Sequence, residues 1–150
     1  MKGEKQAMKK KILNELSLKM LSVSENERFA RTAVCSFVTS QDPTIPELAD
    51  IRTALSEAVT NCIVHGYKNT EGLVYISVKC YDDRSIIIKI KDKGRGMEDV
   101  ERCKQPLYTT DDSGERGGMG FAIMESFMDK MTVTSKVGGG TTVTLYKKLS

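Results

Sequence analysis

The sequence lacks closely spaced cysteines. Its cysteines are Cys35, Cys62, Cys80 and Cys103, and no two of them form a Cys-x-x-Cys motif. Zinc sites in small domains are commonly built on such pairs, so no zinc site is predicted. A chain of 150 residues can also bury enough apolar surface to fold without disulfides. We therefore expect a reduced, cytoplasmic protein.

Long hydrophobic runs and a large excess of one charge are missing as well. The apolar runs fall far short of the roughly 18 residues that a membrane span requires, and the amino terminus is charged, so neither a membrane segment nor a signal peptide is predicted. The net charge is only +3, and five lysines lie within the first 11 residues. Because no basic stripe or known module accompanies them, we expect no direct binding of nucleic acid.

The length of the chain indicates one domain. Residues 1–13 are expected to form a basic, disordered extension, because terminal segments rich in lysine are seldom held in place. Residues 14–150 contain no internal repeat and no interdomain linker, so we assign all of them to a single folded domain.

Three helices are predicted at residues 24–40, 44–66 and 121–131, where apolar residues recur at helical spacing. The first opens with Ser24-Glu25-Asn26-Glu27, which has the pattern of a capping box, and the pair Phe29 and Ala30 starts its apolar stripe. The second opens with Thr44-Ile45-Pro46-Glu47, a second capping pattern. Gly66 is expected to end that helix.

Strands are predicted at residues 16–20, 74–80, 86–92, 132–135 and from 141 onward, where apolar and polar residues alternate. Asp92 shares its strand face with isoleucines, and Thr141 shares its face with Val143, so both are predicted to point into the core. Residues 98–118 are predicted to form a long lid. The order of elements predicts an α+β fold, a two-layer α/β sandwich with helices on one face of a mixed, mostly antiparallel sheet.

Glu57 and Asn61 stand four positions apart on the second predicted helix and therefore share one face. The amide oxygen of Asn61 is a hard ligand that suits magnesium, and a carboxylate one turn away could accept a proton from an attacking hydroxyl. The alternative is that both side chains only decorate a solvated face, because this spacing alone is weak evidence.

Asp92-Lys93-Gly94-Arg95-Gly96 closes a predicted strand. An inward carboxylate needs a hydrogen-bond donor, and glycines beside it would let a flat ring such as adenine approach the backbone. The alternative is an ordinary turn. The segment is not a dinucleotide fingerprint, because the third glycine and the surrounding βαβ unit are absent.

Arg116-Gly117-Gly118-Met119-Gly120 opens the third predicted helix. Free N–H groups and the positive end of a helix dipole favour an anion there, and Arg116 could add a direct contact to a phosphate. The alternative is a flexible hinge between two elements, since the lysine of a Walker motif is missing.

In chain order, these motifs and Gly140-Thr141-Thr142 resemble the N, G1 and G2 boxes and the terminal threonine of the GHKL ATP-binding superfamily. Within that superfamily, the stretches SEAVTNCIVHGY, VYISV, QPLYTT and GMGFAIMESFMD resemble the anti-sigma F factors of endospore-forming bacteria, which are serine-protein kinases. The likeness extends from about Asn14 to Ser150, which is nearly the whole chain.

The resemblance implies a Bergerat-type ATP-binding fold with an ATP lid, and a homodimer that binds ATP and Mg²⁺. It also implies two protein partners. One is the sporulation sigma factor F, which would be bound and inhibited. The other is an anti-anti-sigma factor, which would be inactivated by phosphorylation of a serine.

The resemblance also assigns roles to single residues. It implies that Glu57 is the general base, Asn61 the magnesium ligand, Asp92 the adenine acceptor, and Thr141 a helper at the adenine. It further places Gly94, Gly96, Thr109, Arg116, Gly118 and Gly120 in the nucleotide site, with Arg116 reaching the γ-phosphate from the lid, and Arg31 at the partner-binding surface.

Three alternatives stay open at this point. The protein could be a nucleotide-gated module that holds a sigma factor without significant phosphotransfer, or a stress-response anti-sigma kinase of the same family. It could also be the ATPase part of a histidine kinase or a gyrase-like enzyme. This last alternative is weakened because we find no dimerisation helix with a phosphoacceptor histidine and no second domain.

Overall fold

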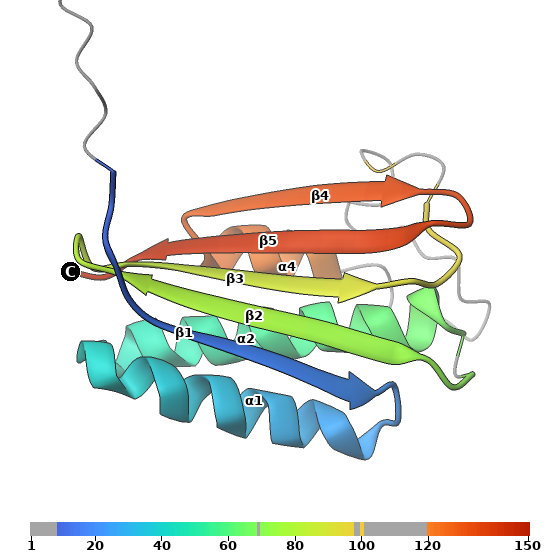
Figure 1. Cartoon of the computed structure of the whole chain (residues 1–150), viewed down its shortest axis with the longest axis horizontal. Helices are drawn as coiled ribbons and strands as arrows, with labels where there is room; N and C mark the ends of the chain where they lie inside the picture. Colours follow the sequence, from blue (N-terminus) through green and yellow to red (C-terminus); the bar gives the residue numbers. More distant parts are fainter. Residues whose placement is uncertain (1–8, 69, 98–99, 101–119) are drawn as a thin grey trace, which may run out of the picture.

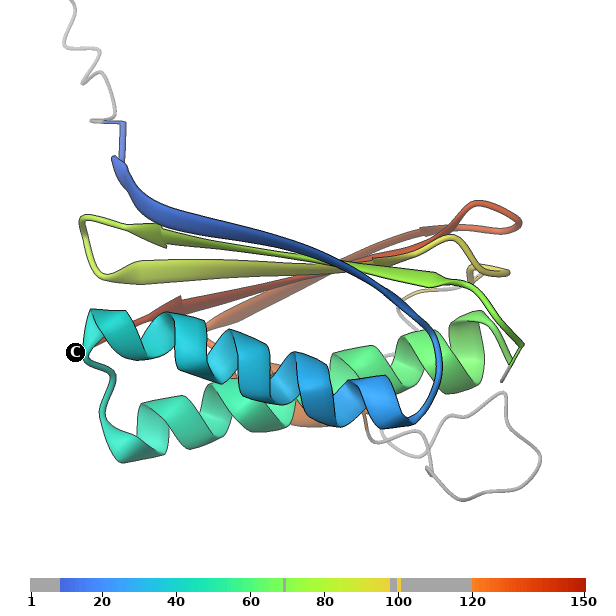
Figure 2. The ribbon, with the colours of Figure 1, turned by 60° about the horizontal axis from the view of Figure 1, so that its bottom comes forward.

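The computed structural model describes residues 9–68, 70–97, 100 and 120–150. Its elements are β1 (Ile12–Leu21), α1 (Glu25–Val38), η1 (Thr39–Gln41), α2 (Ile45–Asn61), η2 (Cys62–Gly66), β2 (Leu73–Tyr81), β3 (Ser85–Asp92), α4 (Gly120–Phe127), β4 (Lys130–Lys136) and β5 (Gly140–Lys148). Helices α1, α2 and α4 lie on one face of a single sheet (Figures 1 and 2). The predicted two-layer α+β sandwich is therefore confirmed.

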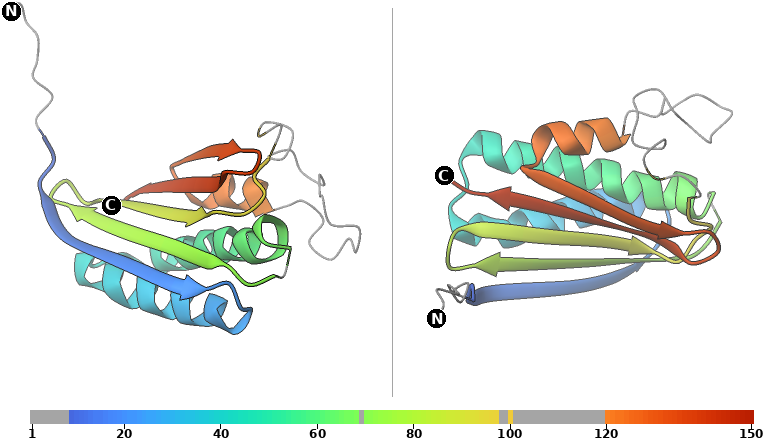
Figure 3. Two further views of the ribbon diagram at one scale, coloured as in Figure 1. Left: turned by 45° about the vertical axis from the view of Figure 1, so that its right-hand side comes forward. Right: turned by 90° about the horizontal axis from the view of Figure 1, so that it is seen from above.

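The sheet has five strands in the order β1-β2-β3-β5-β4. The prediction of a mixed sheet is wrong for the described part of the chain, because all four strand pairings are antiparallel. Two consecutive helices separate β1 from β2, and the chain turns back after β1, after α1 and after α2, so β2 runs opposite to β1 (Figures 1 and 3). Tight turns join β2 to β3 and β4 to β5, which also forces antiparallel pairing.

The core lies between the sheet and the helices. On β3, Ile86, Ile88 and Ile90 are completely buried, while Lys89 and Lys91 on the other face of the strand are exposed, as strand alternation requires. Each buried isoleucine contributes about 1.5 to 3 kcal/mol of transfer free energy. The helical side of the core is supplied by Ala30, Val34, Val38, Ile51, Ala54, Leu55, Ala58, Val59, Phe121 and Met124. None of the helices in the described ranges combines the length and the apolarity that crossing a bilayer needs.

The two predicted capping boxes differ in outcome. At the start of α2, the Thr44 hydroxyl accepts from the Glu47 N–H at 3.2 Å, and the Glu47 carboxylate accepts from the Thr44 N–H at 2.8 Å. At the start of α1, Ser24 makes no such bond. Its backbone is already helical, with φ −55° and ψ −37°, whereas a capping residue has extended backbone. The capping box at Ser24 is therefore a wrong prediction.

Three further details correct the sequence analysis. Strand β1 begins at Ile12, within the segment assigned to the amino-terminal extension, of which residues 1–8 lie outside the described residues. Phe29 is 55% exposed, because the buried stripe of α1 is the narrow row through Ala30 and Val34. Met131 is buried as predicted but belongs to β4, since α4 ends at Phe127.

Lys147 ties three elements together. Its ammonium lies 3.1 Å from Asp50 Oδ2 on α2 and donates to the Phe127 carbonyl of α4 at 2.7 Å, although the residue is only 8% exposed on β5. The bound carbonyl is the one that ends α4, where a cation is favoured by the helix dipole. Lys147 therefore holds both helices against the sheet.

We expect Lys147→Met to lower the free energy of unfolding by about 1 to 3 kcal/mol, because it leaves two acceptors without their charged donor while keeping the volume. Urea unfolding measures this change. Lys148→Met is the matched control: the Lys148 side chain is half exposed and its ammonium lies 3.4 Å from Asp83 Oδ2, so its loss is expected to cost less than about 1 kcal/mol. Equal midpoints for the two variants would contradict this role of Lys147.

Candidate functional site

The predicted nucleotide-site residues that the structure describes gather around the carboxyl-terminal part of α2 and the segment η2 that follows it. Glu57 and Asn61 lie on one face of α2, as predicted, and α4 begins directly against them. A Cβ atom added to Gly120, the first residue of α4, would stand 3.3 Å from Glu57 Oε2 and 3.2 Å from Asn61 Oδ1. The absence of a side chain at Gly120 therefore allows the start of α4 to approach the carboxylate and the carboxamide closely.

Helix α2 does not end at Asn61 but continues into the π-helical segment η2. The Tyr67 N–H donates to the Cys62 carbonyl at 2.9 Å, which is the wider hydrogen-bond ring of a π-turn. This segment carries the chain from Asn61 to the end of β3, where Asp92 lies. The predicted end of the helix at Gly66 is confirmed, but the change of helix type was not predicted.

Asp92 is 3% exposed at the end of β3 and points to the helical side, as its position predicted. The Gly94 N–H donates to Asp92 Oδ1 at 2.9 Å, and the Cys62 thiol is a second donor. Burial raises the pKa of the Asp92 carboxyl, and the donors of Gly94, Cys62 and Thr141 oppose that rise. The carboxylate is thus partly desolvated, and a ligand N–H would stabilise its charged form.

Burial also raises the pKa of the Cys62 thiol well above its ordinary value, and the negative charge of Asp92 adds to this effect. Cys62 is therefore a protonated hydrogen-bond donor. It joins the helix that carries Asn61 to the strand that carries Asp92. Sequence analysis treated Cys62 only as an apolar residue of the helix stripe, because nothing in the spacing indicates its contact with Asp92.

Close backbone contacts explain the glycines around Asp92. A Cβ atom on Gly94 would lie 2.0 Å from the Gly66 carbonyl oxygen, and one on Gly66 would lie 2.8 Å from Asp92 Cγ. The Arg95 N–H donates to the Gly66 carbonyl at 3.0 Å, and Arg95 Nε donates to the His65 carbonyl at 2.9 Å. The turn after β3 is therefore fixed against the end of η2 with no space for side chains at these glycines.

Gly96 and Gly140 have positive φ angles of 73° and 86°. A Cβ atom would stand 2.0 Å from the Lys136 carbonyl oxygen at Gly96 and 2.1 Å from the Asp92 carbonyl oxygen at Gly140. Any larger residue would be strained here and would collide with the backbone. Gly96 thus belongs to the same turn as Gly94 but contacts the β4–β5 hairpin.

Thr141 lies opposite Asp92 on β5 and is 7% exposed. Its hydroxyl lies 2.8 Å from the Ser135 hydroxyl on β4. Ser135 also accepts from the Met97 N–H at 2.8 Å, so the hydroxyl pair joins β4 and β5 to the turn after β3. Sequence analysis missed Ser135, although its alternation with Met131 and Val133 on β4 indicated that it faces inward.

The remaining predicted site residues either lie outside the described residues or, as for Arg31, lie on another helix. Thr109, Arg116 and Gly118 lie outside the described residues, as does nearly all of the predicted lid. Arg31 lies on the middle of α1, where its guanidinium is 3.7 Å from the Glu27 carboxylate one turn earlier. The side chain is 36% exposed, and Phe29 beside it is also exposed.

The oxygen atoms that this site offers suit a magnesium ion bound together with a nucleotide better than a metal ion bound by protein side chains alone. In the described part of the chain, no group of three His, Cys, Asp or Glu side chains is placed to hold a metal ion. Asn61 and Glu57 offer hard oxygen atoms side by side, which fits an ion such as Mg²⁺ that usually completes its shell with phosphates and water.

Comparisons with known proteins identify the family to which this chain is similar. Residues 23–147 match the family model described as histidine kinase-like ATPase domain. The chain is 51% identical over 138 residues to an anti-sigma F factor of Priestia megaterium, covering 91% of this chain and 94% of that protein. It is 52% identical over 134 residues to an anti-sigma F factor of Caldanaerobacter subterraneus subsp. tengcongensis, covering 89% and 93%.

Solved structures show the same fold at low sequence identity. A crystal structure of RsbU and RsbW domains from Mycobacterium tuberculosis matches 91% of this chain and 32% of that chain, with TM-score 0.67 and 21% identity. The catalytic domain of the histidine kinase ThkA matches 91% of this chain and 97% of that domain, with TM-score 0.57 and 13% identity.

Proposed function

The chain belongs to the anti-sigma F factors within the histidine kinase-like ATPase domain family, and we propose that it binds and inhibits sporulation sigma factor F. We propose further that it is an ATP-dependent serine kinase that phosphorylates and inactivates an anti-anti-sigma factor. The observation that carries both proposals is the packing of Glu57, Asn61 and Asp92 around α2 and η2 in a chain about half identical to anti-sigma F factors along nearly its full length.

In this proposal, ATP enters between η2, the end of β3 and the start of α4. The Asp92 carboxylate accepts a hydrogen bond from the adenine amino group, and Thr141 supports that contact. Gly94 and Gly96 allow the turn beside the ring to pack closely against the Gly66 and Lys136 carbonyls. Thr109, Arg116, Gly118 and Gly120 hold the phosphates, and Asn61 would hold Mg²⁺. Magnesium, when bound, would neutralise charge on the phosphate oxygens.

Glu57 would act on the protein substrate. Its carboxylate accepts the proton of the serine hydroxyl, and the serine oxygen forms a bond to the γ-phosphorus. The bond between the γ-phosphorus and the bridging oxygen breaks, and ADP leaves. The position of Glu57 beside Asn61 supports this role, because a base must act next to the ion that orients the phosphates.

Nucleotide state would control partner binding if ATP and ADP favour different states of the residues that contact the γ-phosphate. A nucleotide shifts the equilibrium between those two states only if it binds one of them more tightly than the other. We propose a homodimer as the acting form, following the family. Capture of partners from the native host with ATP compared against ADP tests this regulation.

Incubation with labelled ATP and the anti-anti-sigma factor separates the kinase from a sigma-binding module without phosphotransfer. Phosphoserine on the added protein supports the kinase proposal, and its absence in the presence of bound ATP would remove it. Replacing sigma factor F by a stress-response sigma factor in a binding assay distinguishes the two kinds of anti-sigma kinase.

Arg31→Ala is expected to weaken binding of the protein partners while leaving ATP affinity unchanged. The side chain is partly exposed on α1 beside an exposed Phe29, and its ion pair with Glu27 at 3.7 Å is of the kind that contributes little to stability. Surface plasmon resonance with sigma factor F and calorimetry with ATP measure the two affinities. Arg28→Ala on the same helix is the control. A loss of ATP affinity with normal partner binding would place Arg31 in the nucleotide site instead.

A further inference from the structure

The face of the sheet that the helices leave uncovered is rich in lysine. Strand alternation directs Lys19, Lys79, Lys89, Lys91, Lys130, Lys136 and Lys148 to this face. Glu15 is the one acidic residue among the strand positions that point to the same side in the described chain. Sequence analysis found no basic stripe, because these lysines alternate with buried residues and come from different strands.

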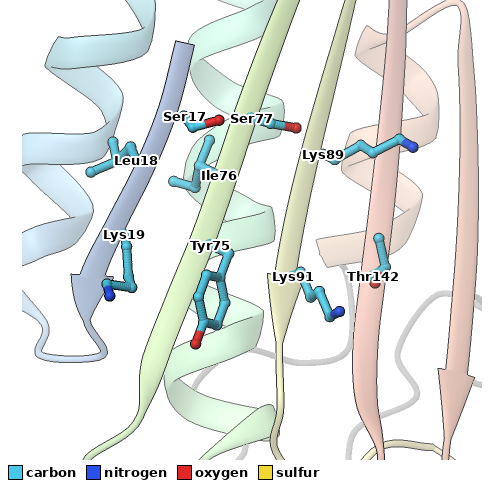
Figure 4. A pocket seen from close by; sticks show the side chains of 9 residues that line it. All are labelled: Ser17, Leu18, Lys19, Tyr75, Ile76, Ser77, Lys89, Lys91 and Thr142. Atoms are coloured by element: carbon cyan, nitrogen blue, oxygen red, sulfur yellow. The ribbon is translucent and has the colours of Figure 1, made fainter.

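A shallow hollow lies in the middle of this face (Figure 4). Its volume is about 330 Å³, and Lys19, Lys89 and Lys91 stand around it. Ser17, Ser77 and Thr142 also line it, and their small side chains leave the space open between the lysines. The floor of the hollow is mostly apolar and includes Leu18, Tyr75 and Ile76, while the lysines and the hydroxyl groups stand around it.

Within the described part of the chain, no carboxylate neutralises the lysines of the hollow. Among the described residues, none forms an ion pair with Lys19, Lys89 or Lys91, whereas Lys147 and Lys148 do have carboxylate partners. The positive charge of these lysines therefore attracts an anionic partner and raises the rate at which that partner associates with the face. It also disfavours a second copy of this face, because stacking two copies would place lysine against lysine.

We propose that this lysine face docks an acidic, extended segment of a partner protein. Lys89, Lys91 and Lys93 follow one another at every second position of the chain, and alternate residues of an extended chain are about 6.8 Å apart. Carboxylates at alternate positions of an extended segment have the same spacing. The face lies on the opposite side of the sheet from Asp92 and Glu57, so a docked segment leaves the proposed nucleotide site accessible.

The aromatic residues of this face favour a peptide over a nucleic acid. Single-stranded nucleic acids bind by stacking bases on exposed rings. The ring of Tyr75 has the Lys93 ammonium 5.1 Å from its centre, and the rings of Tyr81 and Tyr146 have the Lys10 ammonium 5.7 and 5.1 Å from theirs. Because lysine ammonium groups already lie over these rings, the rings do not offer free faces for stacking on bases. The lysines of the face therefore attract a partner by their charge.

The test uses a fluorescein-labelled decapeptide of alternating glutamate and threonine, with anisotropy measured on the full chain at low ionic strength. The triple variant Lys19→Gln, Lys89→Gln, Lys91→Gln is expected to weaken peptide binding about 3- to 150-fold, which corresponds to three exposed ion pairs. The control variant Arg28→Gln, Arg52→Gln, Lys68→Gln removes the same charge from exposed positions of α1, α2 and the segment after η2, and is expected to change binding less than threefold.

Three results would overturn the proposal. Equal weakening by both triple variants, or no binding of the peptide at all, would mean that the lysine face is no docking site. Tighter binding of a ten-nucleotide oligothymidine through the same lysines would identify a nucleic-acid surface instead. A change of oligomeric state in the Lys19, Lys89 and Lys91 variant, measured by sedimentation, would identify a contact between copies of the chain.

Discussion

Glu57→Ala is expected to lower the rate of phosphotransfer to the anti-anti-sigma factor by about 100- to 10,000-fold, the usual contribution of a general base. ATP affinity is expected to stay within a few-fold of the parent, because the proton acceptor is not needed to hold the nucleotide. Single-turnover transfer of labelled phosphate measures the rate, and calorimetry measures the affinity.

Glu57→Gln is the isosteric control for this prediction. It keeps the size and one acceptor oxygen beside Asn61 and Gly120 but cannot accept the proton, so it is expected to be as inactive as Glu57→Ala. Asn61→Ala is expected to differ from both, because loss of the ion ligand should make the remaining activity depend more strongly on magnesium concentration. Equal transfer rates in Glu57→Ala and the parent protein would refute the base assignment.

Asp92→Asn is expected to weaken ATP binding by roughly 10- to 150-fold. The substitution removes a charge-assisted hydrogen bond, which contributes about 1.5 to 3 kcal/mol, and adds an amide N–H where the adenine amino group should donate. The side chain is 3% exposed, so solvent cannot replace the lost contact. Calorimetric titration with ATP and Mg²⁺ measures the change.

Two controls separate affinity from folding in that experiment. Asp82→Asn alters an exposed carboxylate in the β2–β3 turn, which accepts from the Lys11 N–H at 3.2 Å, and is expected to leave ATP affinity unchanged. Urea unfolding of Asp92→Asn shows whether the fold is retained, because the Gly94 N–H can still donate to the amide oxygen. Unaltered ATP affinity in a folded Asp92→Asn protein would show that adenine binds elsewhere.

Local patterns predicted those parts of the fold that local forces determine. The alternation of β3 placed Asp92 on the buried side, and the structure confirms that position with an exposed fraction of 3%. The Thr44 capping box formed because Thr44 has extended backbone. The equivalent pattern at Ser24 failed, since the chain enters α1 directly from a turn after β1 with helical backbone, a feature that the residue types do not reveal.

Contacts between distant segments account for what sequence analysis missed. The hydrogen bond from Cys62 to Asp92 depends on the π-helical continuation of α2, and the Ser135–Thr141 hydroxyl pair depends on the register of β4 and β5. Similarly, the lysines of the open face come together only when β1 and β3 flank β2. Each arises from pairing across the sheet or between layers, and no single stretch of sequence encodes it.

The central claim is that α2, the end of β3 and the start of α4 form one site for a magnesium-bound triphosphate. Calorimetry of the folded protein with ATP and Mg²⁺ tests it most directly. The account predicts saturable heat with one ATP per chain, reduced strongly in Asp92→Asn. Absence of any heat of binding over a range of temperatures, in protein shown to be folded, would contradict the account despite the similarity to anti-sigma F factors.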